Sequence, residues 1–211
     1  MTFMPDIAAL FAFTLAALVL TVTPGPDMTL FLGRTLAQGR AAGVAVMLGA
    51  STGILVHTTL AAVGLSALIA ASPQAFMALR IGGAAYLAWL AYQAIRYGSS
   101  FSVEKAQGRK RSLWGEWARG VSVNLLNPKV ILFNVTFMPQ FVSVADPHAW
   151  QKLFFFGFYF LVLSMPICFA MILGAERVAS LLRRRPAIAR GIDYVFASVF
   201  SGFAVSIFMT R

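Results

Sequence analysis

The sequence predicts an all-α membrane protein with six transmembrane helices. Hydrophobic residues make up 59% of the 211 residues and charged residues only 11%, whereas a soluble domain is nearer ~45–50% apolar and ~25% charged. The apolar runs are long and do not alternate with polar residues, which favours spanning helices over the strands of a β-barrel. In addition, proline interrupts two of these runs beside a charged residue, a pattern typical of transport proteins.

Six apolar segments are long enough to cross a bilayer, whose hydrocarbon core is about 30 Å thick. The first segment has about 27 residues and would measure about 40 Å as one straight helix. A break inside it would therefore take up part of the excess length. The predicted spans are residues 7–33, 42–70, 74–96, 120–142, 150–175 and 191–210.

The first and fourth spans are each broken by a proline that a charged residue follows directly. The two breaks read Thr23-Pro24-Gly25-Pro26-Asp27 and Asn124-Leu125-Leu126-Asn127-Pro128-Lys129. A charge near the middle of a bilayer costs at least about 2.5–3.5 kcal/mol on insertion scales, so it is usually retained for a function. Matched broken helices in the two halves of a membrane protein indicate a transport site.

The breaks suggest two halves of three spans each, residues 1–98 and residues 120–211. Residues 99–119 between them are interpreted as a basic cytoplasmic linker, and they include Trp114 and Trp117, an aromatic pair typical of the membrane interface. Because each half has an odd number of spans, the second half must cross the membrane in the opposite orientation. The sequence therefore predicts two inverted three-helix repeats.

The formal net charge of +10 is distributed unevenly, because 13 of the 17 Lys and Arg residues fall in the loops on one side of the six spans. The positive-inside rule assigns these loops to the cytoplasm, so both termini are predicted on the non-cytoplasmic side. No basic stretch lies in a recognisable nucleic-acid-binding motif, so a nucleic-acid partner is not expected.

One face of the second span carries Ala45, Gly49, Gly53 and His57 at four-residue steps. Residues four apart share a helix face, and small residues let helices approach closely in a membrane. We therefore expect His57 to face neighbouring helices rather than lipid. Such faces serve either packing within the monomer or a homodimer interface, and the sequence leaves both open.

Asp27 and Lys129 are the strongest candidates for binding a solute. The ends of half-helices attract a carboxylate, and a carboxylate together with freed carbonyls attracts an ammonium group. The two breaks together would suit a zwitterion. The alternative is an internal ion pair between Asp27 and Lys129 that closes the bundle, and the two interpretations are compatible if the pair forms in one state only.

The other candidates at the breaks have two interpretations each. Prolines 24, 26 and 128 and Gly25 would shape the site, since proline removes backbone donors and glycine tolerates unusual φ values, or they would only form a kink. Asn124 and Asn127 would either bind the solute or satisfy the broken backbone. His57, whose ordinary pKa lies near neutrality, would relay protons or simply be hydrogen-bonded to a neighbour.

The predicted spans contain no paired carboxylates, no His/Cys cluster with metal-ligand spacing and no phosphate-binding loop. Enzymatic activity, a bound metal ion and other cofactors are therefore not expected. The single cysteine, Cys168, lies in an apolar run and is interpreted as a packing residue.

At these motifs the chain resembles the LysE/RhtB family of bacterial amino-acid exporters. The resemblance is carried by both breaks, by the Gly49, Gly53 and His57 face, and by Pro139-Gln140-Phe141-Val142. It implies a secondary transporter of the bacterial inner membrane that exports homoserine-, threonine-, lysine- or leucine-like amino acids or derivatives, coupled to protons. It also implies that Asp27 and Lys129 belong to the central site, with Asp27 and His57 as candidates for proton coupling.

Two alternatives to an amino-acid exporter working by alternating access remain open. One is an exporter of divalent cations or other small solutes, although only Asp27 and His57 would serve as ligands and Lys129 would repel a cation. The other is a membrane enzyme or structural subunit without transport, which would need a catalytic set that the sequence does not display.

Overall fold

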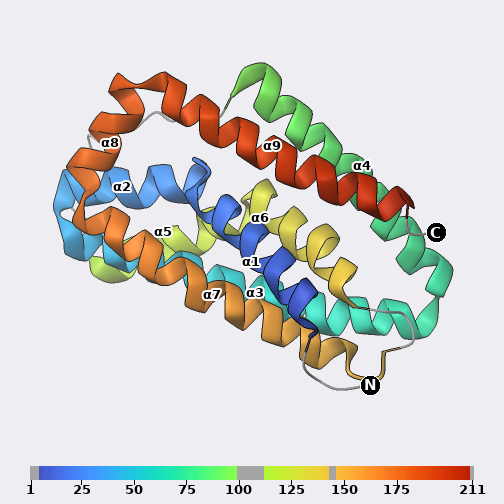
Figure 1. Ribbon diagram of the computed structural model, residues 1–211. Coiled ribbons are helices and arrows are strands. Elements are labelled where there is room, and N and C mark those ends of the chain that lie inside the picture. Colours follow the sequence, from blue (N-terminus) through green and yellow to red (C-terminus); the bar gives the residue numbers. More distant parts are fainter. Residues whose placement is uncertain (1–4, 99–111, 143–145, 210–211) are drawn as a thin grey trace.

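The computed structural model describes residues 5–98, 112–142 and 146–209, and most of the predicted linker, residues 99–111, lies outside these ranges. Within them the chain is helical, with no strand. The helices form one elongated bundle (Figure 1). Helix α8 (Ala175–Arg184) lies at one end of the bundle, and both chain termini lie toward the other end.

The first predicted span is two helices, α1 (Ile7–Val22) and α2 (Pro26–Gln38), bent by 47° at the predicted break. Thr23 and Gly25 have extended backbone conformations between them. Pro26 is the first residue of α2, where its missing N–H costs no hydrogen bond and its fixed φ suits the helix. The proline cluster thus ends one helix and begins the next.

The second break separates α5 (Leu113–Leu125) from α6 (Pro128–Leu132), and the bend between them is 55°. Helix α6 continues as a π-helix (Phe133–Phe137) and a 3₁₀ turn (Met138–Phe141). Pro128 again takes the first position. The side chain of Asn127 caps α6 by accepting a hydrogen bond from the backbone N–H of Lys129 at 3.1 Å.

Helix α5 begins earlier than the span predicted from residue 120, so residues 113–119, the last part of the predicted linker, are helical. Ser112 caps this helix through a hydrogen bond from the Gly115 N–H. Trp114 and Trp117 both lie on this helix, and their rings stack on each other with centroids 4.4 Å apart. The aromatic pair therefore belongs to the helix that leads to the second break.

The remaining long helices are α3 (Arg40–Ala71), α4 (Pro73–Tyr97), α7 (Ala149–Leu173) and α9 (Pro186–Met209). Among the described residues, α3, α7 and α9 are long and apolar enough to span a membrane, and the bent pairs raise the number of candidate spans to five. Helix α4 coincides with the predicted third span, and it is not among the candidate spans found in the described part of the chain. The sixth span and the inverted repeat remain predictions.

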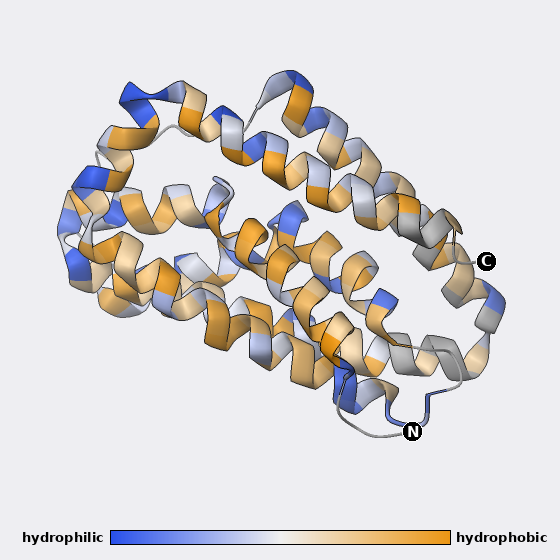
Figure 2. Cartoon of the chain, in the orientation of Figure 1, coloured by the Kyte–Doolittle hydropathy of each residue, from blue (hydrophilic) through white to orange (hydrophobic). Residues whose placement is uncertain are grey.

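Hydropathy divides the bundle along its length. Apolar residues cover most of the long middle part, and hydrophilic residues gather toward the two ends (Figure 2). Helices α4 and α9 pack side by side along one edge of the bundle (Figure 1). This distribution, together with several apolar helices, is that of a multi-pass membrane protein.

The small-residue face predicted in the second span packs against α5. A Cβ atom added to Gly49 would lie 2.0 Å from the backbone oxygen of Trp117, and one added to Gly120 would lie 2.2 Å from that of Val46. A Cβ on Gly53 would lie 2.5 Å from the side chain of Asn124. The prediction that this face contacts neighbouring helices is confirmed, and it is used within the monomer.

Buried apolar residues form layers on either side of the two breaks. On the α1 side, Phe13 lies at the centre of an aromatic cluster, with ring centroids 4.6 to 6.1 Å from those of Phe133, Phe137, Phe141 and Phe156. On the α2 side, a separate cluster is built around Met28, Phe31, Leu32, Met47, Ile172 and Leu182. The breaks lie between these layers.

Candidate functional site

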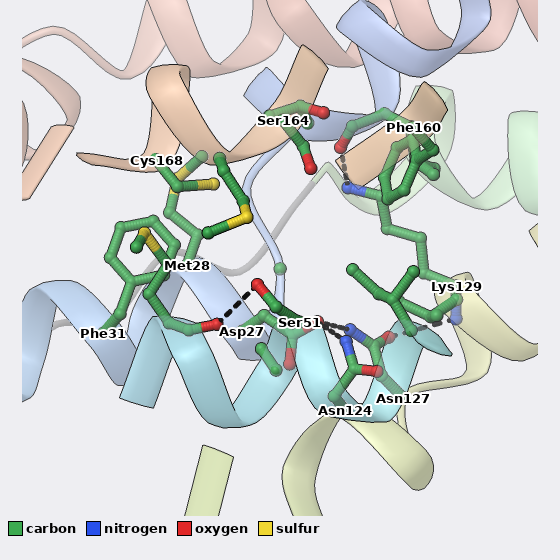
Figure 3. Close-up of a pocket in the computed structure, with 18 of the residues that line it drawn as sticks. Asp27, Met28, Phe31, Ser51, Asn124, Asn127, Lys129, Phe160, Ser164 and Cys168 are labelled. Atoms are coloured by element: carbon green, nitrogen blue, oxygen red, sulfur yellow. Dashed lines mark hydrogen bonds between the residues drawn. The ribbon is translucent and has the colours of Figure 1, made fainter. Parts of the chain in front are cut away.

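A cavity of about 80 Å³ lies at the two helix breaks, lined by residues from both of them and from α3 and α7. A single water needs about 10–15 Å³ on this measure, so the cavity has room for several waters or a small solute. Five of the predicted site residues line it, namely Gly25, Asp27, Asn124, Asn127 and Lys129. Figure 3 shows most of these side chains converging on it.

The prolines have a different role from the polar residues. Pro26 and Pro128 begin α2 and α6, and so set the directions of the half-helices that carry Asp27 and Lys129. Pro24 lies in the bend and lines a neighbouring groove together with Lys129 and Phe196. Their position favours the interpretation that the prolines shape the site.

Asp27 of the first break is held by two amides of the second. Its Oδ2 accepts hydrogen bonds from Asn124 Nδ2 at 2.8 Å and Asn127 Nδ2 at 2.9 Å (Figure 3). Its other oxygen, Oδ1, is buried and has no hydrogen-bond partner. A buried acceptor without a partner is costly, so this oxygen has capacity for a donor from a ligand.

Lys129 of the second break is held by the backbone of the first. Its Nζ donates to the carbonyl oxygens of Leu20 and Thr23, at 2.7 Å each. These carbonyls belong to the last turn of α1 and its cap, where the break frees them and where the helix dipole favours a cation. The Phe196 ring lies 5.8 Å from Nζ and adds a cation–π contact.

The two opposite charges are thus bound crosswise, each by neutral groups of the opposite break. In the described part of the chain, direct ion pairs join Arg34 to Glu116 and Lys152 to Asp146, and Asp27 and Lys129 are not among them. The interpretation of these residues as an internal ion pair does not hold in this structure. The arrangement leaves both charges beside the cavity.

His57 is buried on the small-residue face of α3, as predicted. Its Nε2 lies 3.4 Å from the backbone oxygen of Asn124, within hydrogen-bonding distance. His57 is not one of the residues that line the cavity. It is linked to the cavity through Asn124, which in turn binds Asp27.

The pair of Arg34 on α2 and Glu116 on α5 was not predicted. Arg34 Nε donates to Glu116 Oε2 at 2.9 Å, and a second hydrogen bond joins Arg34 Nη2 to Glu116 Oε1. Both side chains are almost completely buried, at 3% and 0% exposure. Arg34 lies between the first two predicted spans and Glu116 within the predicted linker, and a pairing across 82 residues leaves no local signal in the sequence.

Several apolar cavity residues were also missed. An apolar part of the cavity lining is formed by Met28, Phe31, Met47, Met165 and Cys168. Each lies in an ordinary apolar run, so the sequence distinguishes none of them from core residues. The described residues include no group of three or more His, Cys, Asp or Glu side chains placed to hold a metal ion.

The profile of the LysE type translocator family matches residues 18–211. The chain belongs to this family. It is 31% identical over 191 residues to the homoserine/homoserine lactone efflux protein of Salmonella typhimurium, covering 90% of this chain and 91% of the relative. The protein of the same description from Salmonella typhi is 30% identical, with the same coverage.

A membrane protein of Vibrio cholerae is 28% identical over 93% of this chain and 95% of its own length. No solved structure matches the chain. Membership of the LysE type translocator family, with efflux proteins among the relatives, identifies a multi-pass membrane transporter that exports small molecules rather than an enzyme.

Proposed function

We propose that this LysE-type translocator exports small zwitterionic amino acids or close derivatives, of the homoserine, threonine, lysine or leucine type, from the cytoplasm. It does so as a proton-coupled secondary transporter of the bacterial inner membrane. The observation that carries the proposal is the pair of opposite charges beside one cavity, held apart by neutral groups of the opposite breaks.

The hydrogen-bonding capacity that remains on Asp27 and Lys129 matches the two charged ends of an amino acid. The substrate ammonium group would donate to Asp27 Oδ1, which has no partner. A lysine ammonium has three donors, and Lys129 uses two of them on carbonyls. The third donor would bind the substrate carboxylate, so neither charge must give up its existing partners.

Alternating access would use barriers on both sides of the cavity. On one side lies the aromatic cluster around Phe13. On the other lies the Arg34–Glu116 pair, eight residues along α5 from Asn124, or about 12 Å at the helical rise. Opening one barrier at a time, by rocking of the two inverted halves, would expose the cavity to each side in turn.

Proton coupling requires a group that changes its charge during the cycle. Asp27 touches the cavity directly, and His57 is linked to it through Asn124. We propose Asp27 as the coupling group and His57 as the alternative. The basic loops would face the cytoplasm and both termini the other side of the membrane.

The test is transport by purified protein in liposomes. Labelled amino acids of the four types are offered with and without an imposed proton gradient, to the wild type and to Lys129→Ala and Asp27→Asn. The matched control is Asp6→Asn, because Asp6 is an exposed N-cap residue of α1. We expect gradient-stimulated transport of one amino-acid type, and its loss in the two cavity variants only.

Two results would overturn the proposal. One is correctly inserted wild-type protein that moves none of the four types in either gradient condition. The other is a Lys129→Ala variant that transports as fast as the wild type.

A further inference from the structure

We propose that the cavity wall formed by Met28, Phe31, Met47, Met165 and Cys168, here called the sulfur wall, binds the substrate side chain. We infer that it selects an uncharged side chain of the aliphatic or thioether type, which among the four proposed substrate types favours the leucine type. This inference rests on the proposed function, since it adds a third contact to the two that bind the zwitterion.

The residues of the sulfur wall line the same cavity as Asp27 and Lys129. In Figure 3, Met28, Phe31 and Cys168 lie together on one side of the view, and the label of Lys129 lies on the other. Four of the five wall residues contain sulfur, as the thioether of methionine or the thiol of cysteine. An α-amino acid presents an ammonium group, a carboxylate and a side chain from one carbon, and the cavity offers an anion, a cation and an apolar wall.

The hydroxyl groups of the cavity are already engaged. Thr21 and Thr23 donate to carbonyl oxygens of α1, four residues before each of them. Ser51 donates to the Met47 carbonyl at 3.0 Å, and Ser164 donates to the Leu161 carbonyl. The protons of these hydroxyls are therefore committed to the backbone, so a substrate hydroxyl could donate to their oxygens but could not accept a hydrogen bond from them.

A third charge on the substrate would be unpaired in this cavity. Among the described residues that line the cavity, Asp27 and Lys129 are the charged ones, and both are assigned to the zwitterion. Burying a further ammonium or carboxylate group without a partner is strongly unfavourable. Methionine side chains are flexible and polarisable, so they adapt well to an apolar side chain.

The chain has a built-in probe, because Cys168 is its only cysteine and lines the cavity. The experiment measures the rate at which N-ethylmaleimide labels Cys168 in the wild type, in liposomes, with and without each amino acid. The amino acids are norleucine, methionine, homoserine and lysine, and Cys168→Ser is the control for background labelling. We expect norleucine and methionine to protect at concentrations about tenfold lower than homoserine or lysine.

The outcomes separate this inference from the proposed function. Protection by lysine or homoserine at a lower concentration than norleucine would overturn the side-chain assignment and leave the zwitterion site in place. Protection that persists unchanged in Lys129→Ala would instead overturn the zwitterion site. If native Cys168 is not labelled although the unfolded protein is, or if no amino acid protects it, the assignment of the wall to a substrate site is wrong.

Discussion

Opposite charges from the two halves of the chain meet in two regions of the molecule, and the regions treat them differently. Arg34 and Glu116 bind each other directly, with both side chains buried. Asp27 and Lys129 bind neutral amides and carbonyls of the opposite break instead. A direct pair satisfies both charges internally, whereas charges bound to neutral groups keep capacity for a ligand.

The comparison predicts different losses when one charge is removed. In a buried direct pair, removal leaves the remaining charge without a partner and costs stability. At the breaks, the remaining charge keeps its neutral partners, so the loss should fall mainly on substrate binding. The predictions below run from the largest expected change in free energy to the smallest.

Glu116→Ala should lower the free energy of unfolding by about 3–5 kcal/mol, because it leaves the Arg34 guanidinium buried and unpaired. Thermal unfolding in detergent measures this loss. The matched control is Arg40→Ala, since Arg40 is exposed and contacts only a backbone carbonyl by a long hydrogen bond. The double variant Arg34→Met, Glu116→Leu should recover most of the stability, and a double variant no more stable than Glu116→Ala would contradict a simple pair.

Lys129→Ala should reduce the export rate by at least about 30-fold, because a buried charged contact contributes about 2 kcal/mol or more. Its melting temperature should fall much less than that of Glu116→Ala. Lys152→Ala is the control, since Lys152 pairs with Asp146 away from the cavity. An export rate within twofold of the wild type would remove Lys129 from the site.

Gly49→Ala should destabilise the bundle by about 1–3 kcal/mol, because the added methyl group would overlap the Trp117 backbone and push α3 from α5. Gly82→Ala is the matched control, since no atom lies within 4 Å of a Cβ added there. Helix propensity predicts that this control is neutral or slightly stabilising. Equal melting temperatures for the two variants would show that α3 and α5 do not pack so closely.

Asp146→Asn should have the smallest effect, a decrease of at most about 3 °C in melting temperature near pH 7. Burial raises the pKa of Asp146, but hydrogen bonds from Lys152 and the His148 N–H outweigh it and leave the pKa below 3.8. A carboxyl group whose folded-state pKa is lowered stabilises the fold at pH values above its unfolded-state pKa. This stabilisation is lost as pH falls through the folded-state pKa. The difference from the wild type should therefore shrink as pH falls below 3.8 and vanish once pH falls below the folded-state pKa. A difference that grows on acidification would contradict the sign.

The breaks could be predicted from sequence because their causes are local. Proline removes backbone donors wherever it occurs, and a charge inside an apolar run is visible without a structure. The four-residue spacing of Gly49, Gly53 and His57 likewise predicted a packed face, since periodicity is a property of one helix. For this reason the bends and the packing of this face against a neighbouring helix were predicted correctly, whereas the identity of that helix, α5, was not predicted.

Features that depend on pairing between distant segments could not be predicted. Nothing in the sequence separates Arg34 from the neighbouring loop charges or relates it to Glu116. The crosswise binding of Asp27 and Lys129 depends on the angle between half-helices, which composition does not give. Similarly, Met28 and Cys168 differ from core residues only because a cavity lies beside them.

The most direct test of the central claim is a charge exchange at the breaks, Asp27→Lys with Lys129→Asp, assayed for export in liposomes. If each charge is bound by neutral groups of the opposite break, the exchanged protein should export no faster than Lys129→Ala. The carboxylate at position 129 would then face the Leu20 and Thr23 carbonyl oxygens, which cannot donate a hydrogen bond. Export restored to half the wild-type rate or more would show instead that the two charges act as a direct, exchangeable ion pair.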